Sequence, residues 1–277
     1  MPTKPISINF HLFKPCDARC DFCFATFRDV RGRLSTADAR RVIDALRAAG
    51  GQKITFAGGE PTLHPDIGKL VKHAKQVGFV TGVVTNGSRL AELLEGYGDF
   101  LDWAALSVDS GSEETQASLG RGRGDHVQRS VHLADRCRAH GVRVKMNTVV
   151  TALNWQEDMS GLVRRIAPER WKVFQVLRVV GQNDGRVEPL LITAQQFEAF
   201  LKRHAHLASE GFPAIAEDND AMTDSYVMVD PLGRFYGNTD GIHRTSPPIL
   251  EVGVQRALAA VGFDQAKFEA RGGTYAW

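Results

Sequence analysis

The sequence predicts an α/β protein whose first two-thirds form a partial, TIM-like (β/α)6 barrel, followed by a C-terminal extension. Two observations predict this fold class. Apolar, β-branched runs alternate with helical patterns along the chain, and glycine-rich or polar segments directly follow several of these runs. Repeated strand–helix units favour a parallel sheet covered by helices and partly closed into a barrel. Six such units indicate a partial barrel, because a complete one has eight.

The expected elements follow from the periodicity of the apolar residues. Strands are expected at 5–13, 52–57, 79–85, 103–109, 142–150 and 170–177. Helices are expected between them at 35–49, 65–77, 88–95, 125–140 and 156–166. The first helix has Ser35 as a capping residue and Gly50-Gly51 after its end, and both are typical helix boundaries.

The pattern becomes less regular after about residue 180. A turn-rich segment leads to a helix near 193–208, short strands near 225–236 and a helical piece before the closing RGGTYAW. We therefore expect a barrel over 1–180 and an extension over 181–277 that packs on the barrel and is not a second domain.

Composition restricts the class of protein. With 43% hydrophobic and 24% charged residues, the chain is typical of an ordinary globular protein. A net charge of +2 does not suggest a nucleic-acid surface. No apolar run approaches the roughly 20 residues of a membrane span, and the start has no signal-peptide pattern. Clustered cysteines in a chain of this size favour metal or cluster binding over disulfides, so we expect a reducing, cytoplasmic environment.

Three of the four cysteines form a cluster directly after the first expected strand. Cys16, Cys20 and Cys23 have the spacing Cys-x3-Cys-x2-Cys. Three thiolates on one loop can each bind one iron of a cubane cluster and leave the fourth iron for an external molecule. The alternative is a zinc site with Cys137 or His11 as fourth ligand, but no second Cys-x2-Cys knuckle is present. Cys137 is otherwise most simply a structural thiol.

The cysteine motif and the GGEP segment at 58–61 resemble the radical S-adenosylmethionine (SAM) superfamily. The resemblance implies a [4Fe-4S] cluster on the three cysteines and a SAM site at the carboxyl ends of the strands. The residues it implies for SAM are Gly58, Gly59, Glu60, Asn86, Ser107 and Arg121. Arg121 is the candidate for the SAM carboxylate, and a solvated turn arginine is its alternative reading.

Alternation along the strands predicts cationic side chains inside the barrel. Lys53 alternates with the apolar Ile54 and Phe56, and the fifth and sixth strands repeat this pattern. The inward set comprises Lys53, Lys145, Asn147, Arg170 and Lys172. Few acids lie at matching positions, and buried lysines need partners, so an anionic ligand such as a polyphosphate is expected. The alternative is that these side chains reach solvent near the strand ends.

The closing segment adds a second candidate for anion binding. Arg271-Gly272-Gly273 could form a phosphate nest from an arginine and exposed backbone N–H groups. The aromatic residues Tyr275 and Trp277 indicate that this tail docks on the barrel instead of being free.

A wider set of segments resembles the viperin family of antiviral radical SAM enzymes, from Asn9 to Trp277. These segments are NFHLFKPC with CDFCF, ITFAGGEP, RWKVFQVL, DSYVMVDPLGRF, VGVQRALAAVGFD and RGGTYAW. The chain differs in lacking the N-terminal amphipathic helix of the animal forms, which favours a microbial form without membrane attachment. It also has Ala57 where the family more usually has serine, and Thr274 where a lysine follows the tail glycines.

The viperin resemblance implies dehydration of a ribonucleoside triphosphate (CTP, UTP or GTP) to its 3′-deoxy-3′,4′-didehydro analogue, through removal of the 4′ hydrogen. It places the phosphates on Lys53, Lys145, Asn147, Arg170, Lys172 and Arg271, and the extension closes that site. Asn9 is expected near the ribose or base, and Tyr226 near the sugar as the catalytic group, unless Tyr226 is only a core aromatic.

The implied cofactors are the cluster and SAM, and Mg2+ could accompany the nucleotide. The implied partner is a low-potential electron donor of the flavodoxin or ferredoxin type, with no nucleic acid, no membrane and a monomeric state. The alternative function is a radical SAM enzyme that acts on another phosphorylated small molecule, a peptide or RNA.

Overall fold

The computed structural model describes residues 6–276 and contains one mixed sheet that curves into an open barrel. The strands are β1 Ser7–Phe13, β2 Lys53–Gly58, β3 Val80–Thr85, β4 Trp103–Ser107, β5 Arg143–Val150, β6 Arg170–Gln175, β7 Ala214–Glu217, β8 Val227–Val229, β9 Arg234–Gly237 and β10 Arg244–Pro248. Their order in the sheet is β10-β9-β8-β1-β2-β3-β4-β5-β6-β7. All neighbours from β8 to β7 in this order are parallel, and β9 and β10 are antiparallel additions.

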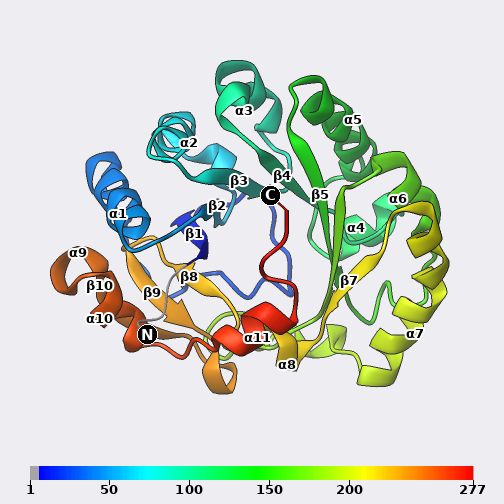
Figure 1. Cartoon of the computed structure of the whole chain (residues 1–277). Helices are drawn as coiled ribbons and strands as arrows, with labels where there is room; N and C mark the ends of the chain where they lie inside the picture. The colour runs from blue at the N-terminus through cyan, green and yellow to red at the C-terminus, as the bar shows by residue number, and fades with distance from the viewer. Residues whose placement is uncertain (1–5, 277) are drawn as a thin grey trace.

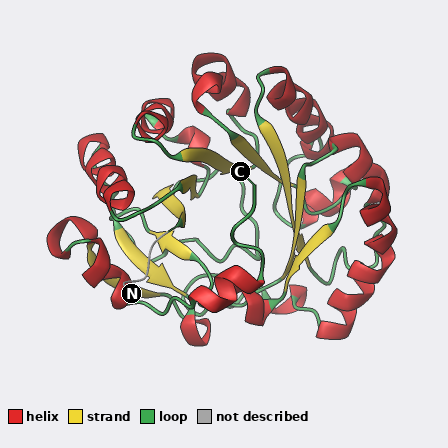
Figure 2. Cartoon of the chain, viewed as in Figure 1, coloured by secondary structure: helices red, strands yellow, loops and turns green. Residues whose placement is uncertain are grey.

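Helices cover the outside of this sheet. They are α1 Thr36–Ala48, α2 Ile67–Gln76, α3 Leu90–Tyr97, α4 Glu113–Ser118, α5 His126–Ala139, α6 Ser160–Ile166, α7 Ala194–His204, α8 Asn219–Met222, α9 Ile249–Val252, α10 Val254–Ala259 and α11 Gln265–Ala270. Figures 1 and 2 show the strands as an inner ring and most helices outside it, while the C-terminal segment runs into the middle of the ring. Within the described part of the chain, no helix is long and apolar enough to cross a membrane.

The fold class predicted from the sequence is confirmed, and each of the six predicted strands is found within a few residues of its expected position. The helix that begins after Ser35 has the expected cap, because the Ser35 side chain accepts a hydrogen bond from the Asp38 N–H. Its buried face packs Val42, Ile43 and Leu46 on the sheet. Pro5 and Trp277, which belong to the predicted first strand and tail, lie outside the described residues.

The sheet extends beyond the six predicted units, and one helix was not predicted. The predicted six-stranded unit is too small, because β7 pairs in parallel with β6 and β8 pairs in parallel with β1. Both added strands come from the region after residue 180, so this region extends the sheet at both edges. The helix α4 was not predicted, since its six residues carry no clear apolar period.

Candidate active site

One cavity of about 870 Å³ runs through the barrel from the cysteine loop to the C-terminal tail. Every site residue predicted from the sequence lines it, including the three cysteines, Asn9, Tyr226 and Arg271. Strand alternation brings them together: Lys53, Lys145 and Lys172 face the cavity, whereas Ile54, Val144 and Trp171 are buried in the outer core.

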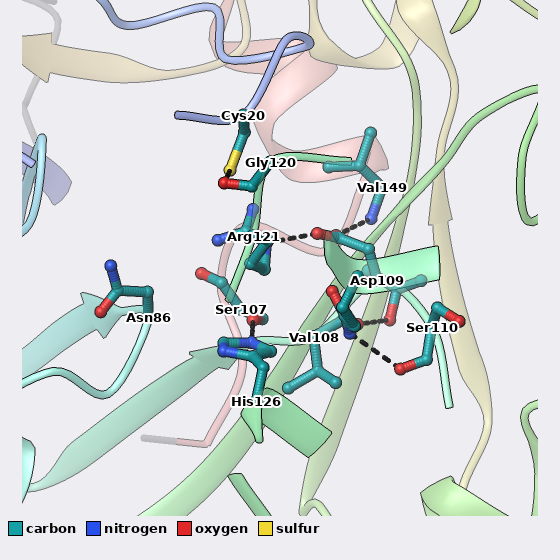
Figure 3. A network of polar contacts seen from close by, with 12 residues as sticks. Cys20, Asn86, Ser107, Val108, Asp109, Ser110, Gly120, Arg121, His126 and Val149 are labelled. Carbon is teal, nitrogen blue, oxygen red and sulfur yellow. Dashed lines mark hydrogen bonds and ion pairs between the residues drawn. The ribbon is translucent and has the colours of Figure 1, made fainter. Parts of the chain in front are cut away.

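The cysteine loop lies at the carboxyl end of β1, where side chains from one strand end can converge. Cys16 is exposed, Cys23 is half-buried and Cys20 is buried with its Sγ 3.7 Å from the Gly120 carbonyl oxygen, as Figure 3 shows. Burial raises the pKa of Cys16 to about 11 and that of Cys20 to about 12. Binding of iron as thiolate ligands would therefore release protons.

The double glycine after β2 packs against this loop. The Gly59 N–H donates to the Phe13 carbonyl at 2.5 Å, and the Glu60 N–H donates to the Pro15 carbonyl at 2.9 Å. A Cβ on Gly59 would lie 2.2 Å from the Lys14 carbonyl oxygen and 2.3 Å from that of Pro15. The glycines thus allow a close approach to the backbone of the cysteine loop, in addition to lining the cavity.

The Glu60 carboxylate joins the loops after β2 and β3. It is buried and accepts hydrogen bonds from the Thr62 and Thr85 hydroxyls, both at 2.6 Å, and from the Asn86 N–H at 2.7 Å. Burial raises the pKa of Glu60, and these bonds oppose the rise. The Asn86 amide in turn donates to Asp17 at 2.8 Å, which attaches the third strand end to the cysteine loop.

Arg121 is not a solvated turn residue. Its guanidinium forms an ion pair with Asp109, and only 12% of the arginine side chain and 1% of the aspartate side chain are exposed. Figure 3 shows this pair beneath Cys20, with Asp109 also accepting from the Val149 N–H at 2.9 Å. Ser107 lies beside it, and its carbonyl contacts the His126 ring nitrogen at 2.8 Å. Asp109 was not predicted as a site residue; its position at the end of the expected strand 103–109 was the available signal.

The end of the cavity near the C-terminal tail carries an excess of positive charge. We call the side chains that supply it the lumen cations. They are Lys53, Lys145, Arg170, Lys172 and Arg271. Burial lowers the pKa of Lys53 to about 7, with a further contribution from Arg170. Burial followed by the charge of Lys53 lowers the pKa of Lys145 well below its ordinary value. Charged lysines in this arrangement repel one another. A bound anion would offset this repulsion and favour their charged, ammonium form.

Tyr275 occupies the centre of this group. Its hydroxyl accepts hydrogen bonds from both Lys53 and Lys145, and its ring lies edge-on to Trp103 with 5.9 Å between ring centroids. The Arg170 guanidinium lies 4.0 Å from the ring centroid. The docking expected for Tyr275 is therefore observed, and it places the tail among the lumen cations.

Two polar atoms of the predicted phosphate-binding side chains lack a partner among the described residues. These are Asn147 Oδ1 and Arg170 Nε, and both are buried. Buried polar atoms are normally hydrogen-bonded, so these two indicate a polar ligand or ordered water at this end of the cavity.

A buried carboxylate lies among the lumen cations, contrary to the expectation that few acids pair with them. Glu217, at the end of β7, is fully buried, forms an ion pair with Lys172 and lies 3.3 Å from Arg271. Its hydrogen bond from the Tyr226 hydroxyl completes the group. Sequence reasoning missed Glu217 because the four-residue strand that carries it was not recognised.

The phosphate nest predicted for the tail glycines is wrong. The Gly272 N–H donates to the Glu269 carbonyl at 3.0 Å, and the Gly273 N–H donates to the Phe268 carbonyl at 2.8 Å. These bonds terminate α11 in the usual manner of a helix C-terminus, so the N–H groups are engaged and do not face the cavity as donors. Arg271 itself does line the cavity.

Comparisons with known proteins define the class. Residues 12–160 match the family model described as Radical SAM superfamily. The structure of SuiB from Streptococcus suis bound to S-adenosylmethionine superposes with a TM-score of 0.75 over 98% of this chain and 67% of that one. At 18% identity this likeness shows the fold. The chain is thus a radical SAM protein.

Relatives of higher identity define the family within that class. A protein of Flammeovirga pacifica named S-adenosylmethionine-dependent nucleotide dehydratase is 44% identical over 98% of this chain and 96% of its own length. A protein of the same name from Lacinutrix mariniflava is 43% identical over 99% of this chain, which spans 59% of that protein. A relative from Oncorhynchus mykiss is 38% identical over 99% of this chain and 81% of its own length. The chain belongs to the viperin family of S-adenosylmethionine-dependent nucleotide dehydratases.

The residues present fit the cofactors of that class. Three thiols from one loop line a single cavity, and each can bind a different iron of a [4Fe-4S] cluster. Among the described residues, no three His, Cys, Asp or Glu side chains converge closely enough to hold one metal ion. Polar groups from the ends of β2 to β4 surround the space beside the thiols, as a bound SAM would require.

Proposed function

We propose that the chain dehydrates a ribonucleoside triphosphate (CTP, UTP or GTP) to its 3′-deoxy-3′,4′-didehydro analogue, as a step in antiviral defence. The observation that supports this proposal is the single cavity that joins the three thiols to the lumen cations. A triphosphate carries negative charge that would balance the excess positive charge at this end of the cavity, and its sugar would extend from there toward the cysteine loop.

The side chains divide the task by their place along the cavity. The lumen cations and Asn147 bind the phosphates, and Asn9 contacts the ribose or base. Tyr226, which accepts a hydrogen bond from Lys172 at 2.7 Å, lies beside the sugar. Mg2+ accompanies the nucleotide, and the segment 181–277 closes the site through Tyr226 and Arg271.

When bound, the cluster and SAM would supply the radical that removes the 4′ hydrogen of the sugar. The 3′-hydroxyl would then leave with one proton as water, and one electron from a flavodoxin- or ferredoxin-type donor would complete the reaction. The protein positions the C4′ atom of the sugar next to the site where the radical forms, and it prevents the radical from reacting with other groups. It acts as a monomer in the cytoplasm.

The test is an anaerobic assay with the reconstituted cluster, dithionite and SAM. CTP, UTP, GTP and ATP are offered separately, and the products are read by mass spectrometry. One nucleotide should raise 5′-deoxyadenosine and give a product lighter by one water. Slow and equal 5′-deoxyadenosine formation with all four, without a dehydrated product, would overturn the proposal and favour a different substrate of a radical SAM enzyme.

Variants connect the assay to the cavity. Lys53→Met should weaken the response to the nucleotide, because a phosphate contact is removed. Lys202→Met is the matched control, since this lysine is exposed on α7 and pairs with Glu198 at 2.9 Å. Equal effects of the two changes would contradict the assignment of the phosphates to the lumen cations.

A further inference from the structure

Glu217 is an unexpected residue in a cavity that binds an anion. It is fully buried, and its two oxygens contact Lys172, Arg271 and Tyr226. A carboxylate here repels phosphates and neutralises part of the charge that would attract them. A site built only for triphosphate affinity would be stronger without Glu217, so the carboxylate needs another explanation.

The contacts of Tyr226 supply that explanation. Its hydroxyl accepts a hydrogen bond from the Lys172 ammonium at 2.7 Å and donates its own hydrogen to Glu217. Glu217 also forms an ion pair with Lys172. Each of the three groups therefore contacts the other two, and we call this set the triangle. Within it, the Lys172 ammonium is hydrogen-bonded to the phenol oxygen that it could reprotonate.

Neighbouring groups fix the orientation of the phenol. The Arg271 guanidinium lies 3.7 Å from the centroid of the Tyr226 ring and donates to the Ser225 carbonyl at 2.7 Å. Lys172 comes from β6, Glu217 from β7, Tyr226 from the residue before β8, and Arg271 from the end of α11. Four separate parts of the chain thus meet at Tyr226, which lines the cavity.

The pKa shifts of the group keep the Tyr226 phenol protonated near neutral pH. Burial raises the pKa of Tyr226 well above its ordinary value, and Glu217 adds to the rise. Burial lowers the pKa of Lys172 to about 8, although Glu217 opposes this. Burial alone would raise the pKa of Glu217, but Lys172 and Arg271 hold it below its ordinary value. Lys172 is therefore the member of the triangle whose proton is most readily transferred near neutral pH.

We propose that Glu217 is a positioning residue that holds Lys172 and Tyr226 as a two-step proton path to the departing hydroxyl of the substrate. The Tyr226 hydroxyl turns its hydrogen from Glu217 to the leaving oxygen. The C3′–O bond breaks as this proton moves, which gives water, and the Lys172 ammonium returns a proton to the phenol. Solvent later reprotonates the Lys172 amine. The electron that completes the reaction comes from the external donor, and this inference rests on the proposed function.

The experiment measures coupling, defined as dehydrated nucleotide formed per 5′-deoxyadenosine. In Glu217→Gln and in Tyr226→Phe, the nucleotide should still stimulate 5′-deoxyadenosine, while coupling falls at least tenfold. The double variant should lose no more coupling than either single variant, since all three disrupt one path. Glu198→Gln, an exposed carboxylate on α7, is the matched control and should leave coupling unchanged.

Nucleotide binding to the cluster-free protein supplies a second readout. Glu217→Gln should bind the triphosphate as tightly as the wild type or more tightly, because a negative charge among the lumen cations is removed. If 5′-deoxyadenosine and the dehydrated nucleotide fall in proportion in Glu217→Gln, with weaker triphosphate binding, Glu217 has only a structural role and the inference is overturned.

The variant Tyr226→Phe removes a single hydroxyl and tests the same path if Glu217→Gln does not fold. Intact coupling in both variants overturns the inference alone, whereas wild-type protein without dehydrated product overturns the proposed function and the inference together.

Discussion

Individual lysines in the cavity are arranged for binding at the expense of stability. Lys145 lies among Lys53, Arg170 and Lys172, and its hydrogen bond goes to the neutral hydroxyl of Tyr275. The pKa of Lys145 lies well below its ordinary value because of burial and these charges. Holding such a group in the folded state costs free energy that only an anionic ligand would recover.

Lys145→Met should therefore raise thermal stability while it weakens nucleotide binding. We expect the midpoint of unfolding to rise by a few degrees, corresponding to about 1 kcal/mol, and triphosphate affinity to fall about 10- to 100-fold. Both quantities are measured on the cluster-free protein: scanning calorimetry gives the midpoint of unfolding, and titration calorimetry gives the triphosphate affinity. A drop in stability would show that the ammonium is better satisfied in the free protein than its surroundings indicate.

Lys53 makes nucleotide binding dependent on pH. Its folded pKa of about 7 lies below its ordinary value of 10.5, so the folded protein binds fewer protons than the unfolded chain between these values. Stability linked to Lys53 is thus fully present above about pH 10.5 and is lost as the pH falls through 7. A bound triphosphate favours the ammonium and opposes this shift.

We consequently expect binding at pH 8 to take up protons. Titration calorimetry in two buffers of different ionisation enthalpy measures the uptake, and Lys53→Met should reduce it. Lys69→Met, on the exposed face of α2, serves as the comparison. Equal uptake in the wild type and Lys53→Met would assign the protons to another group.

At the scale of elements, alternation made much of the candidate site predictable. The inward positions of Lys53, Lys145 and Lys172 follow from two-residue periodicity beside apolar neighbours. The cysteine loop and the GGEP segment were recognisable because each directly follows a strand. Glu217 was not predicted because the four-residue strand that carries it was not recognised. The pairing of Asp109 with Arg121 was not predicted because it depends on how the loop after α4 folds back onto the end of β4.

The turn after β2 permits a direct test of backbone packing. Gly59→Ala should displace the cysteine loop, since the new Cβ would lie within 2.3 Å of two carbonyl oxygens. We expect lower iron content and weaker visible absorbance after reconstitution, with the fold largely retained. Gly96→Ala in α3, where nothing lies within 4 Å of the added Cβ, should keep full iron content and gain up to about 1 kcal/mol of stability. Full iron content in Gly59→Ala would show that the loop can move without loss.

The C-terminal tail permits a test of competition within the cavity. Tyr275 contacts Lys53 and Lys145 through one hydroxyl, and phosphate oxygens would need the same donors. Tyr275→Phe should thus bind the triphosphate about fivefold more tightly, as expected for about 1 kcal/mol of lost competition. Tyr97→Phe in α3 is the control away from the cavity. Weaker binding by Tyr275→Phe would instead make the hydroxyl part of the nucleotide site.

At the scale of the whole molecule, the parallel sheet joins both halves of the sequence. Residues after position 180 supply β7 at one edge and β8 to β10 at the other, and α8 and α11 lie at the opening between them (Figure 1). The strand β7 has four residues, and its apolar pattern is too brief to separate strand from loop. The strand β8 lies within the short strands expected near 225–236, but its three residues gave no sign that it pairs with β1.

The pairing of β8 with β1 has a consequence for how the protein is made. Ile8 is beside Val227 in the finished sheet, so the first strand leaves the ribosome long before its neighbour on that side has been translated. At ordinary rates of synthesis the interval is on the order of tens of seconds. Throughout it, one edge of an apolar strand would stay open to wrong partners. We therefore expect late assembly of the ring, or protection of this edge by chaperones, to matter more here than in a barrel whose strands pair strictly in sequence order.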